Sequence, residues 1–197
     1  MTSRSGRVVP FAVLAVARLL VVVLAHQNRE LRERVSEWRR RATLPHVGMV
    51  VPAFRATTLA GDSVTIGQMN PGGHQVLFVF NTTCGFCLET VPAWKTVFTE
   101  LNAPGMPEKA VYGISLDPEG QTRRYVLDHR LAFPVLCFPD PRLAKLYRAE
   151  GVPLTIVLDH QGEMVHVRMG VLRDRGSIDS VIAAVRQAVV AARTAGE

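Results

Sequence analysis

The chain has 197 residues, of which 48% are hydrophobic and 20% are charged, and this composition excludes a disordered or fibrous protein. Its three cysteines are too few for a small fold held together by disulfides. The formal net charge of +6 would be compatible with binding to nucleic acid. However, residues 1–43 alone hold nine Arg and three Glu, whereas the remainder carries 14 basic and 14 acidic side chains. Because the globular part has no surplus of positive charge, we predict that the protein does not bind nucleic acid.

An apolar run near the N-terminus, residues 8–25, is interrupted only by Pro10 and Arg18. As a helix it would be about 27 Å long, close to the thickness of the hydrocarbon core of a bilayer. We therefore predict that residues 1–25 form a retained membrane anchor. A cleaved signal peptide is the alternative, because a short basic segment precedes the run. Either form would export the rest of the chain.

Residues 26–43 are rich in charge, and we predict that they form a helical stalk. Six Arg lie between positions 29 and 41, and the positive-inside rule applied to them would keep the following domain in the cytosol. The chemistry that the cysteines of the globular part indicate argues for export instead. We therefore place that domain outside the cytosol.

Residues 44–197 alternate between strand-like and helix-like apolar patterns, which predicts one α/β domain. A hairpin turn is expected at Gly61-Asp62, and continuous apolar runs predict buried central strands. The order of the elements favours a mixed central sheet covered on both faces. The predicted strands are 50–60, 63–66, 75–80, 110–116, 133–138, 154–159 and 164–169, and the predicted helices are 88–101, 119–129, 141–148 and 177–193.

The motif Cys84-Gly85-Phe86-Cys87 follows the buried strand 75–80 and opens a helix. At a helix N-terminus a thiolate is stabilised by the helix dipole and by unpaired backbone N–H groups. The second cysteine, one turn further along, can close a disulfide with the first. We therefore predict that Cys84 is the exposed attacking thiol and Cys87 the buried resolving thiol, and that exchange passes through a mixed disulfide.

Two structural roles for these cysteines compete with redox chemistry. A structural zinc ion requires four ligands, and the chain has no second Cys-x-x-Cys, so Cys137 and a scattered histidine would have to complete the site. A static disulfide would close too short a loop to stabilise the fold strongly. We predict redox catalysis with no metal and no other cofactor. Cys137 lies in an apolar stretch and is predicted to be a buried, inert thiol.

Five groups of residues, in order and at matching spacing, resemble the thioredoxin-fold redoxin family, in particular the membrane-anchored thiol–disulfide oxidoreductases of the TlpA/ResA type. The resemblance covers nearly all of the globular part. It implies a thioredoxin-like fold with an N-terminal β-hairpin extension. The residues that carry it are 47–54 with 59–64, Cys84–Cys87 with Pro92, 113–117, 151–155, and Asp159, Gly162 and Gly170.

The resemblance also places Val152-Pro153 in a cis-proline loop that faces the cysteine pair. X-Pro bonds are the ones that readily become cis, and such a turn would leave the backbone N–H and C=O of Val152 available to an extended substrate segment. An ordinary trans proline before an edge strand is the alternative. The predicted substrate-binding residues are Val152 and Pro153, together with Gly85 and Phe86 between the cysteines.

The chain departs from the thioredoxin pattern at one position that matters for proton transfer. Thioredoxin has a buried Asp six residues before its first cysteine, and Phe78 occupies that position here. Proton transfer must therefore use another group or water. Glu89 is a candidate, with stabilisation of the helix as the alternative role.

The predicted function is reduction of disulfides in exported proteins, for example during maturation of cytochrome c or of another extracytoplasmic protein. The resemblance implies two partners, a protein thiol or disulfide substrate and an upstream electron donor in the membrane. The predicted location is the bacterial cytoplasmic membrane, with a single span and the catalytic domain on the periplasmic side. If the signal is cleaved, the protein would instead be soluble in the periplasm.

Three other functions compete with this one. A thiol peroxidase of the related peroxiredoxin type would need Pro and Thr where this chain has Leu77 and Asn81. A non-enzymatic binding or chaperone module would use the Val152-Pro153 groove without the cysteines. A metal carrier would bind copper or zinc through Cys84 and Cys87.

Overall fold

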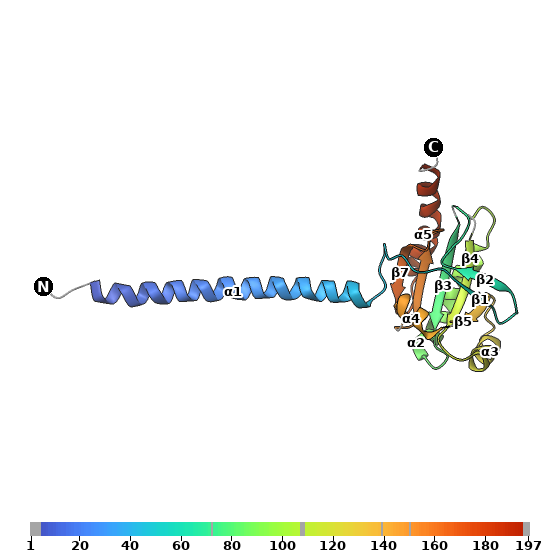
Figure 1. Cartoon of the computed structure of the whole chain (residues 1–197), viewed down its shortest axis with the longest axis horizontal. Coiled ribbons are helices and arrows are strands. Elements are labelled where there is room, and N and C mark those ends of the chain that lie inside the picture. Colours follow the sequence, from blue (N-terminus) through green and yellow to red (C-terminus); the bar gives the residue numbers. More distant parts are fainter. Residues whose placement is uncertain (1–4, 72, 107–108, 139, 150, 195–197) are drawn as a thin grey trace. The chain divides into compact units, whose positions relative to one another are not determined.

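The computed structural model describes residues 5–71, 73–106, 109–138, 140–149 and 151–194, and the side chains of 5–13, 15–16, 36–42 and 188–194 lie outside the description. The chain divides into two compact units, Met1–Leu44 and Pro45–Glu197. The first unit consists of one helix, α1 (Ser5–Thr43), and the second carries the other described elements (Figure 1).

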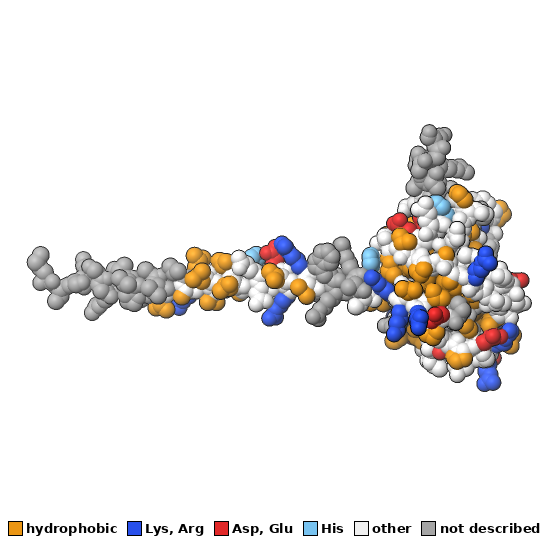
Figure 2. Space-filling view, viewed as in Figure 1, with side chains coloured by type: hydrophobic (Ala, Val, Ile, Leu, Met, Phe, Trp, Pro, Cys, Tyr) orange, Lys and Arg blue, Asp and Glu red, His pale blue; other side chains and the backbone are white. Residues whose placement is uncertain are grey.

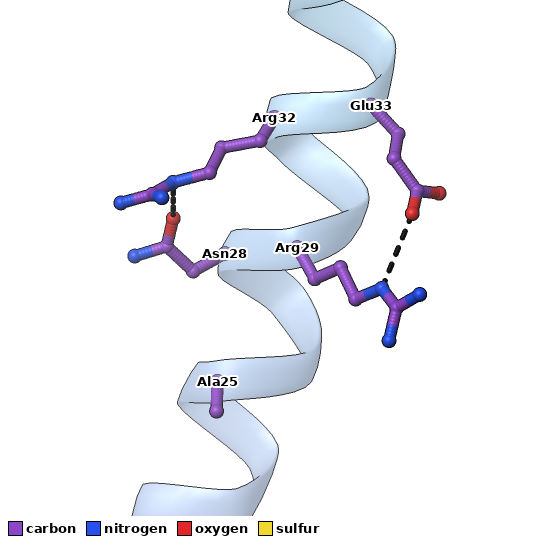
Figure 3. A pocket seen from close by; sticks show the side chains of 5 residues that line it. All are labelled: Ala25, Asn28, Arg29, Arg32 and Glu33. Carbon is purple, nitrogen blue, oxygen red and sulfur yellow. Dashed lines mark hydrogen bonds and ion pairs between the residues drawn. The ribbon is translucent and has the colours of Figure 1, made fainter.

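Helix α1 runs without a break through both the predicted anchor and the predicted stalk. Figure 2 shows hydrophobic side chains along the described part of the apolar stretch and charged side chains beyond it. Pairs one turn apart lie on opposite sides of the charged stretch: Arg29 Nε is 3.2 Å from Glu33 Oε1, and Arg32 Nε donates to Asn28 Oδ1 at 2.9 Å (Figure 3). Each pair stabilises a helix by about 0.2–0.5 kcal/mol, so the stalk sequence favours the helix locally.

Among the described residues, none of the helices combines the length and the apolar character needed to cross a bilayer. Part of the predicted anchor, residues 8–13 with Ala15 and Val16, falls on side chains outside the description. Within the first unit, the described apolar side chains Leu19 and Leu20 are both more than half exposed.

The central sheet of the second unit consists of β3 (His74–Phe80), β4 (Lys109–Ser115), β5 (Val135–Cys137), β6 (Leu154–Leu158) and β7 (Met164–Met169). Their order across the sheet is β5-β4-β3-β6-β7 (Figure 1). The middle strand pairs in parallel with β4 and antiparallel with β6, so the sheet is mixed, as predicted. Every residue of β3 is buried, which explains why its sequence is largely a continuous apolar run.

Side chains of β3 alternate between two buried clusters, one on each face of the sheet, because successive residues of a strand point to opposite sides. Phe78 and Phe80 belong to the cluster that also contains residues of α2 (Gly85–Leu101) and α5 (Arg175–Thr194). Leu77 belongs to the other cluster. Full burial of one such side chain contributes about 1.5–3 kcal/mol, so β3 stabilises both faces of the sheet.

The order of the elements is the one predicted from the sequence, and most boundaries differ only at the ends. Helices α3 (Glu119–Asp128) and α4 (Pro141–Leu146) end slightly earlier than predicted. Helix α2 begins at Gly85 rather than at residue 88, directly after the first cysteine.

The prediction of a long first strand over residues 50–60 is wrong. Strand β1 covers only Phe54–Thr57 and pairs antiparallel with β2 (Ser63–Ile66). Ahead of β1, Pro52 has no N–H to contribute to a ladder, and the Val51 N–H donates to Gly162 O at 3.0 Å instead. The segment before the hairpin therefore packs on the turn that joins β6 and β7.

We expect Gly162→Ala to lower the free energy of unfolding by about 2–4 kcal/mol. The added Cβ would crowd neighbouring backbone atoms, and the backbone of residue 162 has a left-handed conformation that alanine disfavours. A Cβ on Gly162 would lie 2.6 Å from Gly67 O and 2.9 Å from Val51 O, at a φ of +82°. Gly61 is the matched control, since its φ is +97° but a Cβ there would meet nothing within 4 Å. Gly61→Ala should cost about 1 kcal/mol. Urea denaturation measures both, and equal losses would contradict the packing argument.

Candidate active site

Cys84 caps the N-terminus of α2 with its sulfur. Its backbone is extended (φ −82°, ψ 112°), and the backbone N–H of Cys87 donates to Cys84 Sγ at 3.3 Å. The sulfur thus occupies the place that an oxygen of Ser, Asp or Asn fills in most capped helices. It lies at the positive end of the helix dipole and next to a backbone N–H, the two features that favour a nucleophilic thiolate.

Cys87 lies one turn into α2 and is fully buried in the cluster formed with β3. Both cysteines are free thiols in this structure. Burial raises the pKa of Cys87 to about 12, with further upward contributions from its hydrogen bond with Cys84 and from the charges of Cys84 and Asp117. Cys87 is therefore protonated at neutral pH. A half-buried Cys84 beside a buried, protonated Cys87 is the asymmetry that the predicted division of roles requires.

The loop before β6 brings Val152 and Pro153 to the cysteine pair. The Val152–Pro153 peptide bond is cis, as expected from the sequence. The Val152 carbonyl oxygen lies 3.9 Å from Cys84 Sγ, within range of a weak S–H donor. Pro153 is buried, and its own carbonyl accepts from Gly170 N at 2.8 Å, which ties the loop to the end of β7. Residues far apart in the sequence thus form one site.

Exposed apolar side chains surround this site. Phe86 is 60% exposed, and Leu88 and Met169 are also exposed. Met169 pairs with Leu154 in the sheet, next to the cis-proline loop. At Gly85, a Cβ would meet nothing within 4 Å, so the space above the first turn of α2 is open. An apolar surface around a reactive thiol suits contact with a protein segment.

Asp117, after the end of β4, fixes the loop that leads from β3 to Cys84. Its carboxylate accepts from Asn81 Nδ2 at 2.9 Å, from the Thr82 N–H at 2.5 Å and from the Thr82 hydroxyl at 2.6 Å. We did not single out this residue for a role from the sequence. The sequence did indicate that Asp117 lies near this loop. Residues that follow the carboxyl ends of neighbouring parallel strands, such as β3 and β4, lie close together.

Phe78, at the position of the thioredoxin Asp, is fully buried and carries no proton to exchange. Its ring stacks on Trp94 with centroids 5.2 Å apart. The Trp94 indole N–H donates to Thr155 Oγ1 at 2.9 Å, so these two buried polar groups are hydrogen-bonded to each other. Glu89 is exposed and its carboxylate lies 2.7 Å from Arg173 Nη2, so it has an ion-pair partner on the segment that leads to α5.

The prediction that Cys137 is buried is wrong, because this residue, like Cys84, is only partly buried. It lies at the end of the short edge strand β5 and lines an open cleft of about 510 Å³ together with Glu119 and Arg123. Its sulfur is 3.6 Å from Thr122 Oγ1. Partial burial raises the pKa of Cys137, which disfavours its thiolate. Among the described residues, no group of three or more His, Cys, Asp and Glu is placed to hold a metal ion.

We expect Asp117→Asn to lower the free energy of unfolding by about 1–3 kcal/mol, because it weakens the charge-assisted hydrogen bonds that hold Asn81 and Thr82. Asp128→Asn is the control, since this carboxylate is exposed on α3 and should change stability by less than about 0.5 kcal/mol. Chemical denaturation of both variants checks this. Equal stabilities of the two variants would contradict the role of Asp117 in holding this loop.

Comparison with known proteins agrees with this geometry. A model of the AhpC/TSA family matches residues 47–167. The chain is 24% identical over 144 residues to methylamine utilization protein MauD of Methylophilus methylotrophus, covering 73% of this chain and 64% of MauD. It is 25% identical over 128 residues to thiol-disulfide oxidoreductase ResA of Halalkalibacterium halodurans, covering 65% of this chain and 71% of ResA. The chain thus spans less than two thirds of the length of MauD.

The fold is also similar to that of solved structures. The thioredoxin domain of a thiol-disulfide oxidoreductase from Bacteroides vulgatus superposes with a TM-score of 0.58 at 20% identity, covering 71% of this chain and 98% of that one. At this identity the likeness shows a thioredoxin-like fold. The family match covers more than half of the residues and includes both cysteines and the cis-proline loop. The chain therefore belongs to the AhpC/TSA family of thioredoxin-fold proteins.

Proposed function

We propose that this protein is a thiol–disulfide oxidoreductase that reduces disulfides of other proteins through Cys84 and Cys87. One observation carries the proposal: the capping sulfur of Cys84 lies 3.9 Å from the Val152 carbonyl oxygen and accepts at 3.3 Å from the backbone N–H of Cys87, a fully buried second thiol. The proposed nucleophile Cys84 thus has both the proposed resolving thiol and the Val152 backbone as neighbours. The name of the relative ResA, a thiol-disulfide oxidoreductase, supports the same chemistry.

The reaction consists of two exchanges of sulfur partners. The Cys84 thiolate attacks one sulfur of the substrate disulfide, that S–S bond breaks, and the other substrate sulfur leaves as a thiolate. Cys87 then loses its proton and attacks Cys84 Sγ, which releases the second substrate thiolate and leaves a Cys84–Cys87 disulfide. Two electrons have passed to the substrate. Each further turnover requires a dithiol reductant, and we propose that an upstream donor in the membrane supplies it.

The substrate is proposed to be an extended segment of an exported protein, such as a cytochrome c precursor or another protein that matures outside the cytosol. Its backbone would pair with Val152 beside the cis-proline, in the manner of an added strand. Phe86, Leu88 and Met169 offer apolar contact on either side of the cysteine pair. Gly85 leaves room for the substrate to reach the sulfur of Cys84.

A thiol peroxidase is the rival within the same family, and two residues disfavour it. The positions that would carry its Pro and Thr hold Leu77, which is fully buried within β3, and Asn81, whose amide donates to Asp117. A peroxide-consumption assay run beside the disulfide assay separates the two activities.

Three cysteine variants test the proposed roles. Cys84→Ser should abolish reduction of a protein disulfide, because it removes the attacking sulfur. Cys87→Ser should attack once and then stall as a stable mixed disulfide, which mass spectrometry of the trapped complex identifies. Cys137→Ser is the control and should keep full activity, because its sulfur lies on the edge strand at the far side of β4. Loss of activity in Cys137→Ser, or full activity in Cys84→Ser, would refute the assignment.

We propose separately that residues 8–25 keep the protein at the bacterial cytoplasmic membrane with the thioredoxin-like unit outside. This proposal rests on the apolar run of residues 8–25, which the charged stalk follows directly. Fractionation of cells that express the full chain should place it in the membrane fraction, with the globular unit accessible to protease added to the periplasm. A chain that begins at residue 26 in the soluble periplasm would overturn the anchor. Protection from that protease would overturn the orientation.

A further inference from the structure

The charged stretch of α1, residues 26–43, contains four apolar residues, Leu31, Val35, Trp38 and Ala42. They are spaced four, three and four residues apart, which places these positions along one narrow side of the helix. The members whose side chains are described, Leu31 and Val35, are 63% and 49% exposed. Because α1 is the one element described in the first unit, no other described element of that unit covers this stripe.

The same spacing continues toward the N-terminus through Asn28, Leu24 and Val21. Alternating steps of three and four residues make the seven-residue repeat of a coiled coil, and the repeat holds over three heptads from residue 21 to residue 42. Valine occupies position a at both ends of the described part, and leucine occupies position d between them. We call Val21, Leu24, Asn28, Leu31 and Val35 the seam, and its four apolar side chains are all exposed.

The residue types of the seam select a second copy of this chain as the partner. Valine at position a with leucine at position d favours two parallel helices, and a single asparagine at position a fixes their register. Asn28 holds that position. Its Oδ1 accepts from Arg32 Nε at 2.9 Å, and its Nδ2 forms no hydrogen bond within the described part of the chain, so it can donate to the same residue of a second copy (Figure 3). An apolar helix would leave this amide buried without a partner.

We propose that the seam of α1 joins two copies of this protein as a parallel, in-register, two-stranded coiled coil. This inference goes beyond the proposed function and does not depend on it. Each seam side chain packs against its counterpart in the second copy, which removes Leu31 and Val35 from water. The outward side stays polar, since Arg29 and Glu33 form their ion pair on the side of the helix away from Asn28 (Figure 3).

The charges beside the seam give this dimer a distinct salt dependence. The flanking positions hold Arg32 and Arg34, and Arg39 and Arg41 follow in the sequence, so side chains of the same sign face each other across the dimer. Glu30 offsets part of this repulsion within each chain, since its Oε1 lies 3.1 Å from Arg34 Nη2. Salt screens the repulsion that remains between exposed charges. The dimer should therefore become tighter as ionic strength rises, whereas a complex of these arginines with an acidic helix or an anionic lipid surface would weaken.

Cross-linking of single cysteines in the full chain tests the seam. All three native cysteines are replaced by Ser, so that each introduced cysteine is the only one. Leu24→Cys and Val35→Cys lie in the seam, and Glu33→Cys is the matched control on the outward side. A disulfide requires Cβ atoms within about 4.5 Å of each other, which only facing positions reach. Under mild oxidation in nonionic detergent, both seam variants should form the cross-linked dimer at least about tenfold faster than Glu33→Cys on a non-reducing gel.

The two seam positions also report the orientation of the helices. Residues 24 and 35 are about 16 Å apart along the helix, so an antiparallel pair cannot bring each of them to its own counterpart. Cross-linking at only one of the two positions would overturn the parallel, in-register dimer. Equal rates at residues 24, 33 and 35 would overturn the seam itself.

Sedimentation equilibrium of the reduced full chain in nonionic detergent measures the association directly. The native sequence should be a dimer, with a dissociation constant that falls several-fold between about 50 mM and about 500 mM NaCl. Leu31→Lys should be a monomer because it places a charge in the seam, whereas Glu33→Lys should remain a dimer. A monomeric native chain, a dimer that dissociates as salt rises, or equal association of the two Lys variants would refute the coiled coil. None of these results bears on the chemistry of the cysteine pair, so the proposed function is tested separately.

Discussion

The hydrogen bond from the Cys87 N–H to Cys84 Sγ is the contact on which the rest of the site depends. It makes Cys84 the cap of α2, so the helix begins at the next residue and its first turn is fixed relative to β3. With the cap in place, Cys87 necessarily points one turn inward, into the cluster below the sheet. One local interaction therefore decides which sulfur is partly exposed and which is buried.

The surroundings then set the chemical difference between the two thiols. Burial holds the pKa of Cys87 far above neutrality, and the nearby carboxylate of Asp117 acts in the same direction. That carboxylate also holds the loop before Cys84 through Asn81 and Thr82. The loop before the first cysteine is thus fixed by hydrogen bonds, and the second cysteine keeps its proton at neutral pH.

Much of this arrangement could be predicted from the residues themselves. The apolar run of β3, the Cys-Gly-Phe-Cys motif after it and Val152-Pro153 before β6 each have a strong local pattern, and the structure places them together. The role of Asp117 was not predicted because it depends on which strand ends become neighbours in the sheet. The burial of Cys137 was predicted wrongly because an apolar sequence does not reveal that its strand is short and lies at the edge of the sheet. The late start of the first strand, at Phe54 instead of residue 50, reflects Pro52.

The most direct test of the account is to map which cysteine of the reduced full-length protein reacts with iodoacetamide at neutral pH. The capped, half-buried Cys84 should be labelled first, Cys137 more slowly, and Cys87 only after a denaturant exposes it. Peptide mass spectrometry at increasing times gives the order. Labelling of Cys87 in the folded protein at the same rate as Cys84 would contradict the asymmetry on which the proposed function rests.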